Sequence, residues 1–152
     1  MRYWLMKSEP DEASIDHLAN APQRTLPWTG VRNYQARNFM RDGMKVGDGV
    51  LFYHSSCEVV GVAGIASVVA SAYPDPTQFD PKSDYFDAKS TRAEPRWSLV
   101  EVKFKRKLKR TISLTELKDR RELEGFALVR PGNRLSVLPV TQAQWEFILS
   151  LE

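Results

Sequence analysis

The side chains best suited to binding chemistry gather between Trp28 and Arg41. Asn33 is a favourable N-cap, and it predicts a helix from Tyr34 to about Asp42. One face of that helix combines a ring, an amide and two guanidinium groups: Tyr34, Arg37, Asn38 and Arg41. On spacing alone, such a face is either an ordinary solvated surface or a recognition surface for a flat, anionic ligand such as a nucleotide.

Other aromatic and polar side chains recur near the ends of expected strands or near turns. The rings are Trp4, Trp28, Tyr34, Tyr53, Tyr73 and Trp97, and the nearby polar groups include Ser8, Asn33, Asn38, Ser55 and Arg134. Stacking a base on an aromatic ring contributes about 1–3 kcal/mol. Amide and hydroxyl groups can read the edge of an unstacked base. The set therefore begins to describe a pocket for a nucleobase.

Residues 103–110, Lys-Phe-Lys-Arg-Lys-Leu-Lys-Arg, form the most basic run of the chain. Lysines along a strand protect an exposed sheet edge from unwanted pairing. The same cations could contact phosphates. The run favours neither interpretation over the other.

Metal binding and nucleophilic catalysis find little support. His17, His54 and Cys57 are too few for a four-ligand Cys/His zinc site without carboxylates. His54, Ser55 and Cys57 are close in sequence, but neighbouring strand residues point to opposite faces. The chain has no nucleophile elbow, phosphate loop or dinucleotide fingerprint. We therefore predict no metal, no cofactor and no catalytic residue.

Length, net charge and cysteine content limit the classes of protein to which the chain can belong. A length of 152 residues favours a single domain over residues 1–152, and a net charge of +3 permits a polyanionic partner without requiring one. A single cysteine excludes an intrachain disulfide and fits a reducing compartment. No apolar run approaches the roughly 20 residues of a membrane span. We expect a soluble protein without a membrane partner, cytoplasmic, or nuclear in a eukaryote.

The expected order of elements along the chain is a series of short strands, with short helices near the beginning and near the end of the sequence. The expected strands are 3–7, 50–54, 59–70, 97–105 and 134–138. Ser14, Asn33, Ser113 and Thr141 are the expected helix N-caps. Residues 73–96 form the longest irregular segment, and a loop of this length is usually functional or packs on itself. The pattern predicts an α+β domain around a small, mostly antiparallel sheet or open barrel.

Five stretches closely resemble the EVE domain family: Tyr3–Pro10, Trp28–Phe39, Phe52–Ser55, Ala72–Asp75 and Arg134–Val137. The resemblance runs from Tyr3 to the last helix. It implies a PUA-like fold, which is a mixed, mostly antiparallel β-barrel with short helices packed around it. The family is related to the YTH domain, which reads methylated adenine in RNA through an aromatic cage. The resemblance thus implies a reader of modified bases in nucleic acid, including modified cytosine.

Carried over by position, the resemblance implies a base pocket formed by Trp4, Lys7, Ser8, Trp28, Val31, Arg32, Asn33, Tyr34, Asn38, His54, Ser55, Tyr73 and Pro74, with Trp97, Arg134 and Ser136 as additions. Expected phosphate contacts are Arg37, Arg41, Lys103 and Lys105. By residue type, Trp and Tyr rings would sandwich the base, and Asn33, Asn38 or Ser55 would bond its edge. Lys7, Arg32 or Arg134 would hold flanking phosphates. Thr29 and Ser56 depart from the commonest form of the family, so the modified base stays open.

The leading hypothesis is a non-catalytic module that reads a modified base in DNA or RNA. The alternative is an enzyme acting on a nucleotide or a small nucleobase compound in the same pocket, with His54 as its acid–base group. A third possibility is an interaction module whose pocket binds a peptide.

Overall fold

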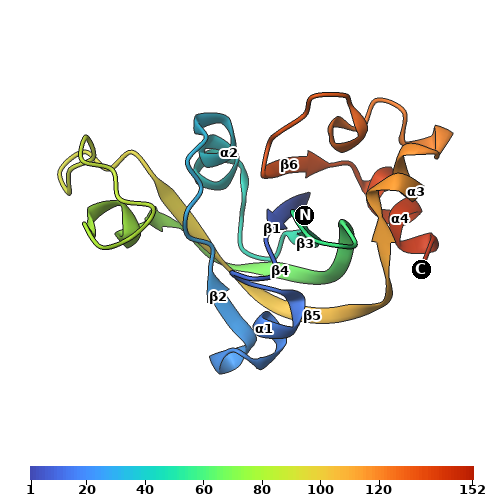
Figure 1. The fold of residues 1–152 in the computed structure, drawn as a ribbon, viewed down its shortest axis with the longest axis horizontal. Helices are drawn as coiled ribbons and strands as arrows, with labels where there is room; N and C mark the ends of the chain where they lie inside the picture. The colour runs from blue at the N-terminus through green and yellow to red at the C-terminus, as the bar shows by residue number, and fades with distance from the viewer.

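A computed structural model describes residues 1–152 as one six-stranded, strongly curved sheet with helices on both faces (Figure 1). The strands are β1 (Tyr3–Ser8), β2 (Thr25–Pro27), β3 (Gly49–His54), β4 (Gly61–Pro74), β5 (Ser98–Ser113) and β6 (Val137–Val140), in the spatial order β2-β5-β4-β3-β1-β6. Only the β1–β3 pair is parallel. The α+β class and the mostly antiparallel sheet are confirmed. The barrel is not, because the ladder ends at β2 and β6 without closing.

The helices are short, and local capping decides where they begin. They are α1 (Ile15–Asn20), α2 (Tyr34–Asn38), α3 (Leu114–Lys118) and α4 (Gln142–Ser150). Ser14, Asn33, Ser113 and Thr141 accept hydrogen bonds from backbone N–H groups of their first turns, so all four expected caps are confirmed. None of these helices is long and apolar enough to cross a membrane.

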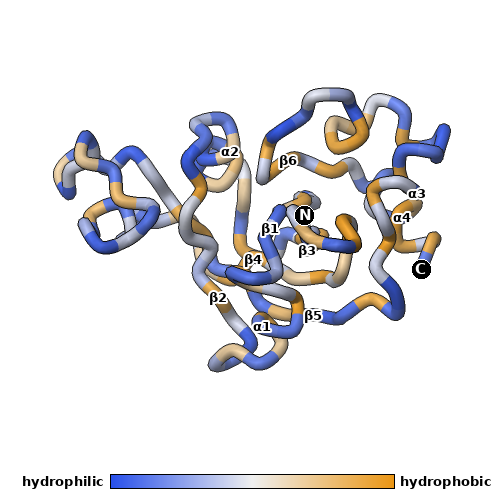
Figure 2. Tube along the Cα trace, in the orientation of Figure 1, coloured by the Kyte–Doolittle hydropathy of each residue, from blue (hydrophilic) through white to orange (hydrophobic).

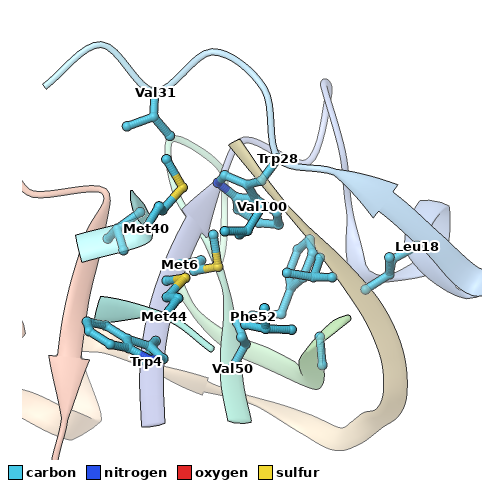
Figure 3. Packing of buried hydrophobic residues seen from close by; sticks show 14 of the residues in the cluster. Trp4, Met6, Leu18, Trp28, Val31, Met40, Met44, Val50, Phe52 and Val100 are labelled. Carbon is cyan, nitrogen blue, oxygen red and sulfur yellow. The ribbon is translucent and has the colours of Figure 1, made fainter. Parts of the chain in front are cut away.

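Two hydrophobic clusters lie on opposite faces of the sheet, because its central strands are buried on both sides. In β3, Val50 and Phe52 face the cluster covered by α1 and α2, whereas Leu51 and Tyr53 face the cluster covered by α3 and α4. Figure 3 shows the first cluster, in which methionines and tryptophans fill the space beneath α2. This cluster forms the floor beneath the stretch that begins at Trp28.

Some expected elements differ from the structure in bounds or in geometry. The strand expected at 134–138 begins only at Val137, while the backbone N–H of Lys7 donates to the Ser136 carbonyl at 2.8 Å. The helix expected to reach Asp42 leaves α geometry after Asn38 and ends in a π-helical turn, Phe39–Gly43. The strand expected from Trp97 does not alternate between buried and exposed residues at its start, because Trp97, Leu99 and Val100 are all buried. Register shifts between β4 and β5 break the simple alternation there.

Three of the six cations in residues 103–110 of β5 form ion pairs within the chain. Figure 2 shows this stretch of β5 as largely hydrophilic along the lower part of the view. Arg106 pairs with Glu152, Lys107 with Asp16, and Arg110 with Glu116. β2 pairs with β5 only from Glu101 to Lys103, so the strand beyond is an exposed edge. The edge-strand interpretation therefore fits this stretch, with three cations neutralised within the chain.

Candidate nucleic-acid interface

A cavity of about 510 Å³ opens between the end of β1, the stretch 26–32 and the loop before β6. Its volume falls within the roughly 300–1,000 Å³ range of ligand sites. Sixteen residues line it: Lys7, Ser8, Glu9, Glu12, Ala13, Leu26, Pro27, Trp28, Thr29, Gly30, Val31, Arg32, Ser55, Tyr85, Arg134 and Ser136.

The parallel pairing of β1 and β3 places the first polar groups of the cavity. Ser8 lies opposite His54 at the carboxyl ends of the two strands, and the Ser55 backbone N–H donates to the Ser8 carbonyl at 2.9 Å. The Ser8 hydroxyl donates to the carbonyl of Ala13 at 2.7 Å. This bond fixes the turn after β1, so the two serines lie side by side at the cavity edge.

The cavity is lined by two cations, Lys7 and Arg134, that form no ion pair within the protein. Lys7 is half-buried, and its Nζ lies 5.6 Å from the centre of the Tyr53 ring with no carboxylate within ion-pair distance. Burial lowers the pKa of Lys7, because desolvation disfavours the charged form. Arg134 is exposed and also unpaired. Both side chains are thus free to bind an anionic ligand.

The opposite wall is built by the stretch from Trp28 to Arg32. The Trp28 backbone N–H donates to the Val100 carbonyl at 2.8 Å, and its buried ring packs edge-on against Phe52 at 5.3 Å. Gly30 has a φ of +86°, and a Cβ atom there would lie 2.7–2.9 Å from ring atoms of Tyr85. The tyrosine ring therefore lies directly against the glycine backbone and closes this side of the cavity.

Asp75, fully buried, clamps this wall to the long loop. It accepts hydrogen bonds from the Gly30 N–H at 2.8 Å, from Arg32 at 3.2 Å, and from both the backbone and the hydroxyl of Thr77. Arg32 also donates to Thr77 and to the carbonyls of Val31 and Tyr85. All of its N–H donors are engaged, so Arg32 holds the wall and has none left for a phosphate.

The segment between β4 and β5 is ordered around one buried amide. Gln78 donates to the carbonyls of Asp75 and Trp97, and it accepts from Ser90 and from two backbone N–H groups, Arg96 and Trp97. Tyr85 is presented from this loop, and its hydroxyl donates to Glu12 at 2.7 Å. That bond and burial raise the pKa of Tyr85 to about 12. The long segment is thus a packed loop that supplies one wall of the cavity.

The EVE domain model matches residues 2–151. The chain belongs to the EVE domain family. Thymocyte nuclear protein 1 from Homo sapiens is 43% identical over 167 residues, covering 99% of this chain and 73% of the relative. A solved protein from Pseudomonas putida is 52% identical, with a TM-score of 0.94 and 98% coverage of both chains. Human THYN1 in complex with 5-methylcytosine-containing DNA is 42% identical, with a TM-score of 0.95, covering 99% of this chain and 97% of that one.

The EVE fold brings half of the expected base-pocket residues to the cavity: Lys7, Ser8, Trp28, Val31, Arg32, Ser55, Arg134 and Ser136. The other half lie elsewhere: Trp4, Asn33, Tyr34, Asn38, His54, Tyr73, Pro74 and Trp97. Trp4 is buried and donates to Asp48. The Asn33 side-chain oxygen caps α2, the Asn38 oxygen accepts from Arg37, and Tyr73 donates to Glu101.

The expected phosphate contacts also lie outside the cavity lining. Arg37 sits beside the Tyr34 ring, and Arg41 pairs with Asp42 on the surface of the π turn. Lys103 and Lys105 are exposed on β5, where Lys103 lies opposite Thr25. None of these four cations lines the cavity.

Sequence reasoning missed eight cavity residues: Glu9, Glu12, Ala13, Leu26, Pro27, Thr29, Gly30 and Tyr85. Glu9 and Glu12 follow the end of β1, next to Ser8. Their position after this strand could have placed them at the cavity. Leu26 and Pro27 reach the cavity because β2 pairs with β5, more than seventy residues along the chain. No local pattern reports such a pairing.

His54, the expected acid–base group of an enzyme, is engaged in the fold. Its Nε2 accepts a hydrogen bond from the Ile15 backbone N–H at 3.1 Å, and it does not line the cavity. Burial lowers the pKa of His54, so the folded protein favours the neutral ring. The stability this gives is complete above the unfolded pKa of about 6.5 and is lost as pH falls through the folded pKa.

We therefore expect the free energy of unfolding to fall as pH decreases from about 7 to about 5. A His54→Gln variant can still accept from Ile15 without titrating, so it should lose less over the same window. Urea unfolding of both proteins at a series of pH values measures the difference, and carboxylates common to both cancel. Equal pH slopes would contradict this role of His54.

Proposed function

We propose that this EVE domain binds DNA containing a modified cytosine and takes the modified base into the 510 Å³ cavity. The observation that carries the proposal is the cavity's composition: two rings, an apolar side chain, hydroxyl groups and unpaired cations in one site. The human THYN1 protein, solved with 5-methylcytosine-containing DNA, supports it, since the two chains share 42% identity across nearly their whole lengths.

Residue types suggest the roles within the site. Trp28 and Tyr85 offer aromatic surface to a base, and Val31 offers an apolar contact to a methyl group. Ser55 and Ser136 offer hydroxyl groups to a polar edge. Burying one methyl group discriminates by only about 1–3 kcal/mol, so the preference for the modified base would be moderate.

We also propose that the domain acts without catalysis. His54 supports this, because its Nε2 is engaged with the Ile15 N–H and its side chain does not line the cavity. Incubation with free nucleosides and with modified oligonucleotides, followed by chromatography, tests it. Turnover of any of these compounds would favour the nucleotide-modifying alternative.

Binding can be measured by fluorescence anisotropy with duplexes that differ only in one 5-methyl group. Tighter binding of the methylated duplex is expected, by up to about 100-fold. An RNA duplex of the same sequence and a free methylated nucleoside serve as further arms. Equal affinity for methylated and unmethylated DNA would refute the proposed reading of the methyl group.

Lys7→Gln should weaken DNA binding while leaving the fold intact. The half-buried ammonium has no carboxylate partner, and burial disfavours its charge, so the neutral variant loses only the cation–π contact with the Tyr53 ring at 5.6 Å. Loss of one phosphate contact should reduce the slope of log K against log salt by about 0.9. Lys45→Gln, at an exposed turn outside the cavity, is the matched control. Identical salt slopes for parent and Lys7→Gln would remove Lys7 from the interface.

A further inference from the structure

A half-exposed tyrosine lies outside the cavity, at the first position of α2. The Tyr34 side chain is 50% exposed, an unusual exposure for a ring that packs so closely on another aromatic. Its ring stacks on Trp97 with centroids 4.8 Å apart and planes 22° apart. One face of Tyr34 is therefore covered by Trp97.

The partner ring is fixed in place. Trp97 is only 6% exposed, its indole N–H donates to Asp87 at 2.7 Å, and its backbone N–H donates to Gln78 at 3.0 Å. A buried ring held at both its backbone and its indole nitrogen cannot follow a moving neighbour. Tyr34 thus rests on a rigid support.

Arg37 is the cation that lies over the Tyr34 ring. The Arg37 guanidinium carbon lies 4.7 Å from the Tyr34 centroid and 6.0 Å from the Trp97 centroid. Tyr34 keeps 50% exposure beside this cation, so part of its ring surface remains open to a flat ligand. Arg37 is held there by the Arg96 carbonyl at 2.7 Å and by Asn38. A fixed positive charge therefore borders an exposed aromatic surface.

The same stack continues to the cavity wall. The Arg32 guanidinium carbon lies 5.4 Å from the Trp97 centroid and 5.5 Å from the Tyr85 centroid. Tyr85 lines the cavity. Contacts through Trp97 and Arg32 therefore connect Tyr34 to Tyr85, which lines the proposed base pocket.

We propose that the exposed ring surface of Tyr34 stacks the nucleobase that neighbours the base held in the cavity, on the same strand. This subsite rests on the proposed function. A nucleobase fits because the surface is flat, aromatic and bordered by a cation, which suits a base with its phosphate, and stacking of this kind tolerates any base. Arg37 then lies beside the phosphate of that neighbouring nucleotide.

The test is a thermodynamic cycle between Tyr34→Ala and an abasic site. Anisotropy titrations use the intact methylated duplex and duplexes with an abasic site 5′ or 3′ of the methylcytosine. We expect Tyr34→Ala to weaken binding of the intact duplex about tenfold. One of the two abasic duplexes should bind the parent protein about tenfold more weakly and show no further loss with Tyr34→Ala.

Two further variants separate stacking from folding. Tyr34→Phe keeps the ring and should bind like the parent protein, whereas Phe86→Ala removes another exposed aromatic, outside the cavity, and should have no effect. Thermal unfolding checks that Tyr34→Ala remains folded at the titration temperature.

Equal weakening on all three duplexes would show that Tyr34 only shapes the pocket and would overturn the subsite. An unchanged affinity of Tyr34→Ala for the intact duplex would overturn it as well. The same four affinities, of the parent protein and Tyr34→Ala for the intact and the abasic duplex, can also be measured with unmethylated DNA, because Tyr34 does not line the cavity. Failure of methyl discrimination in the parent protein therefore counts against the proposed function, independently of the outcome at Tyr34.

Discussion

Asp75→Ala is expected to lower the free energy of unfolding by about 3 kcal/mol, the lower end of the range for breaking a buried ion pair. The carboxylate is fully buried and accepts hydrogen bonds from Gly30, Arg32 and Thr77. Its removal leaves the Gly30 N–H without its partner and Arg32 without its counter-charge. The lower end applies because Arg32 keeps 22% side-chain exposure, so solvent compensates part of the loss.

The loss can be measured by urea unfolding followed by tryptophan fluorescence. A melting temperature about 6–12 °C below that of the parent protein is the corresponding thermal result for a chain of this size. The stability of Asp75→Asn should lie between those of the parent protein and Asp75→Ala. Its side chain keeps one oxygen that can accept hydrogen bonds, but it has lost the charge. Asp42→Ala removes an exposed carboxylate paired with Arg41 and should change stability little. If Asp75→Ala and Asp42→Ala unfold alike, the clamp does not stabilise the fold.

The same variant connects stability with binding. Asp75 lies more than forty residues after Gly30 and Arg32 in the sequence. It nevertheless holds these wall residues against the loop that presents Tyr85. Weaker DNA binding by Asp75→Ala at a temperature where it remains folded would show that this wall is preorganised for the ligand. The long loop would then serve binding chiefly as a support for one wall.

The sequence predicted local features well, because local interactions decide them. The four helix caps depend on residues three positions apart, and each was recognisable by residue type. The polar end of β1 was recognisable from the apolar run that Ser8 and Glu9 terminate. Ser8 was recognisable in this way as a polar group near a pocket, whereas Lys7 was assigned to the pocket by the resemblance to the EVE family, and both line the cavity.

The sequence did not predict which side chains already spend their hydrogen bonds within the fold. Arg32 lines the cavity as expected, yet its donors are consumed by groups more than forty residues away. Asn33 was predicted both to cap α2 and to bond a base edge, and its oxygen does the first. Residue type gives the capacity to bond, whereas the partners already present decide what remains for a ligand.

Gly30→Ala is expected to weaken DNA binding by about tenfold or more and to destabilise the fold by about 2–5 kcal/mol. An alanine at a φ of +86° costs about 1–2 kcal/mol from the backbone alone. The added Cβ would lie 2.7–2.9 Å from three atoms of the Tyr85 ring, and such overpacking adds about 1–3 kcal/mol. The ring is tethered at both ends, since its hydroxyl bonds Glu12 and its backbone carbonyl bonds Arg32, so relief requires the cavity wall to move.

Gly125→Ala separates the two contributions. Gly125 has a φ of +89°, nearly that of Gly30, but a Cβ there would meet nothing within 4 Å. It should therefore show the backbone cost alone, measured by urea unfolding, and bind methylated DNA with the parent's affinity in anisotropy titrations. The difference between the two variants isolates the contact between Gly30 and Tyr85. Because both carry the same backbone penalty, a binding defect confined to Gly30→Ala would place the ligand against this wall, and an equal defect in both would assign the loss to general destabilisation.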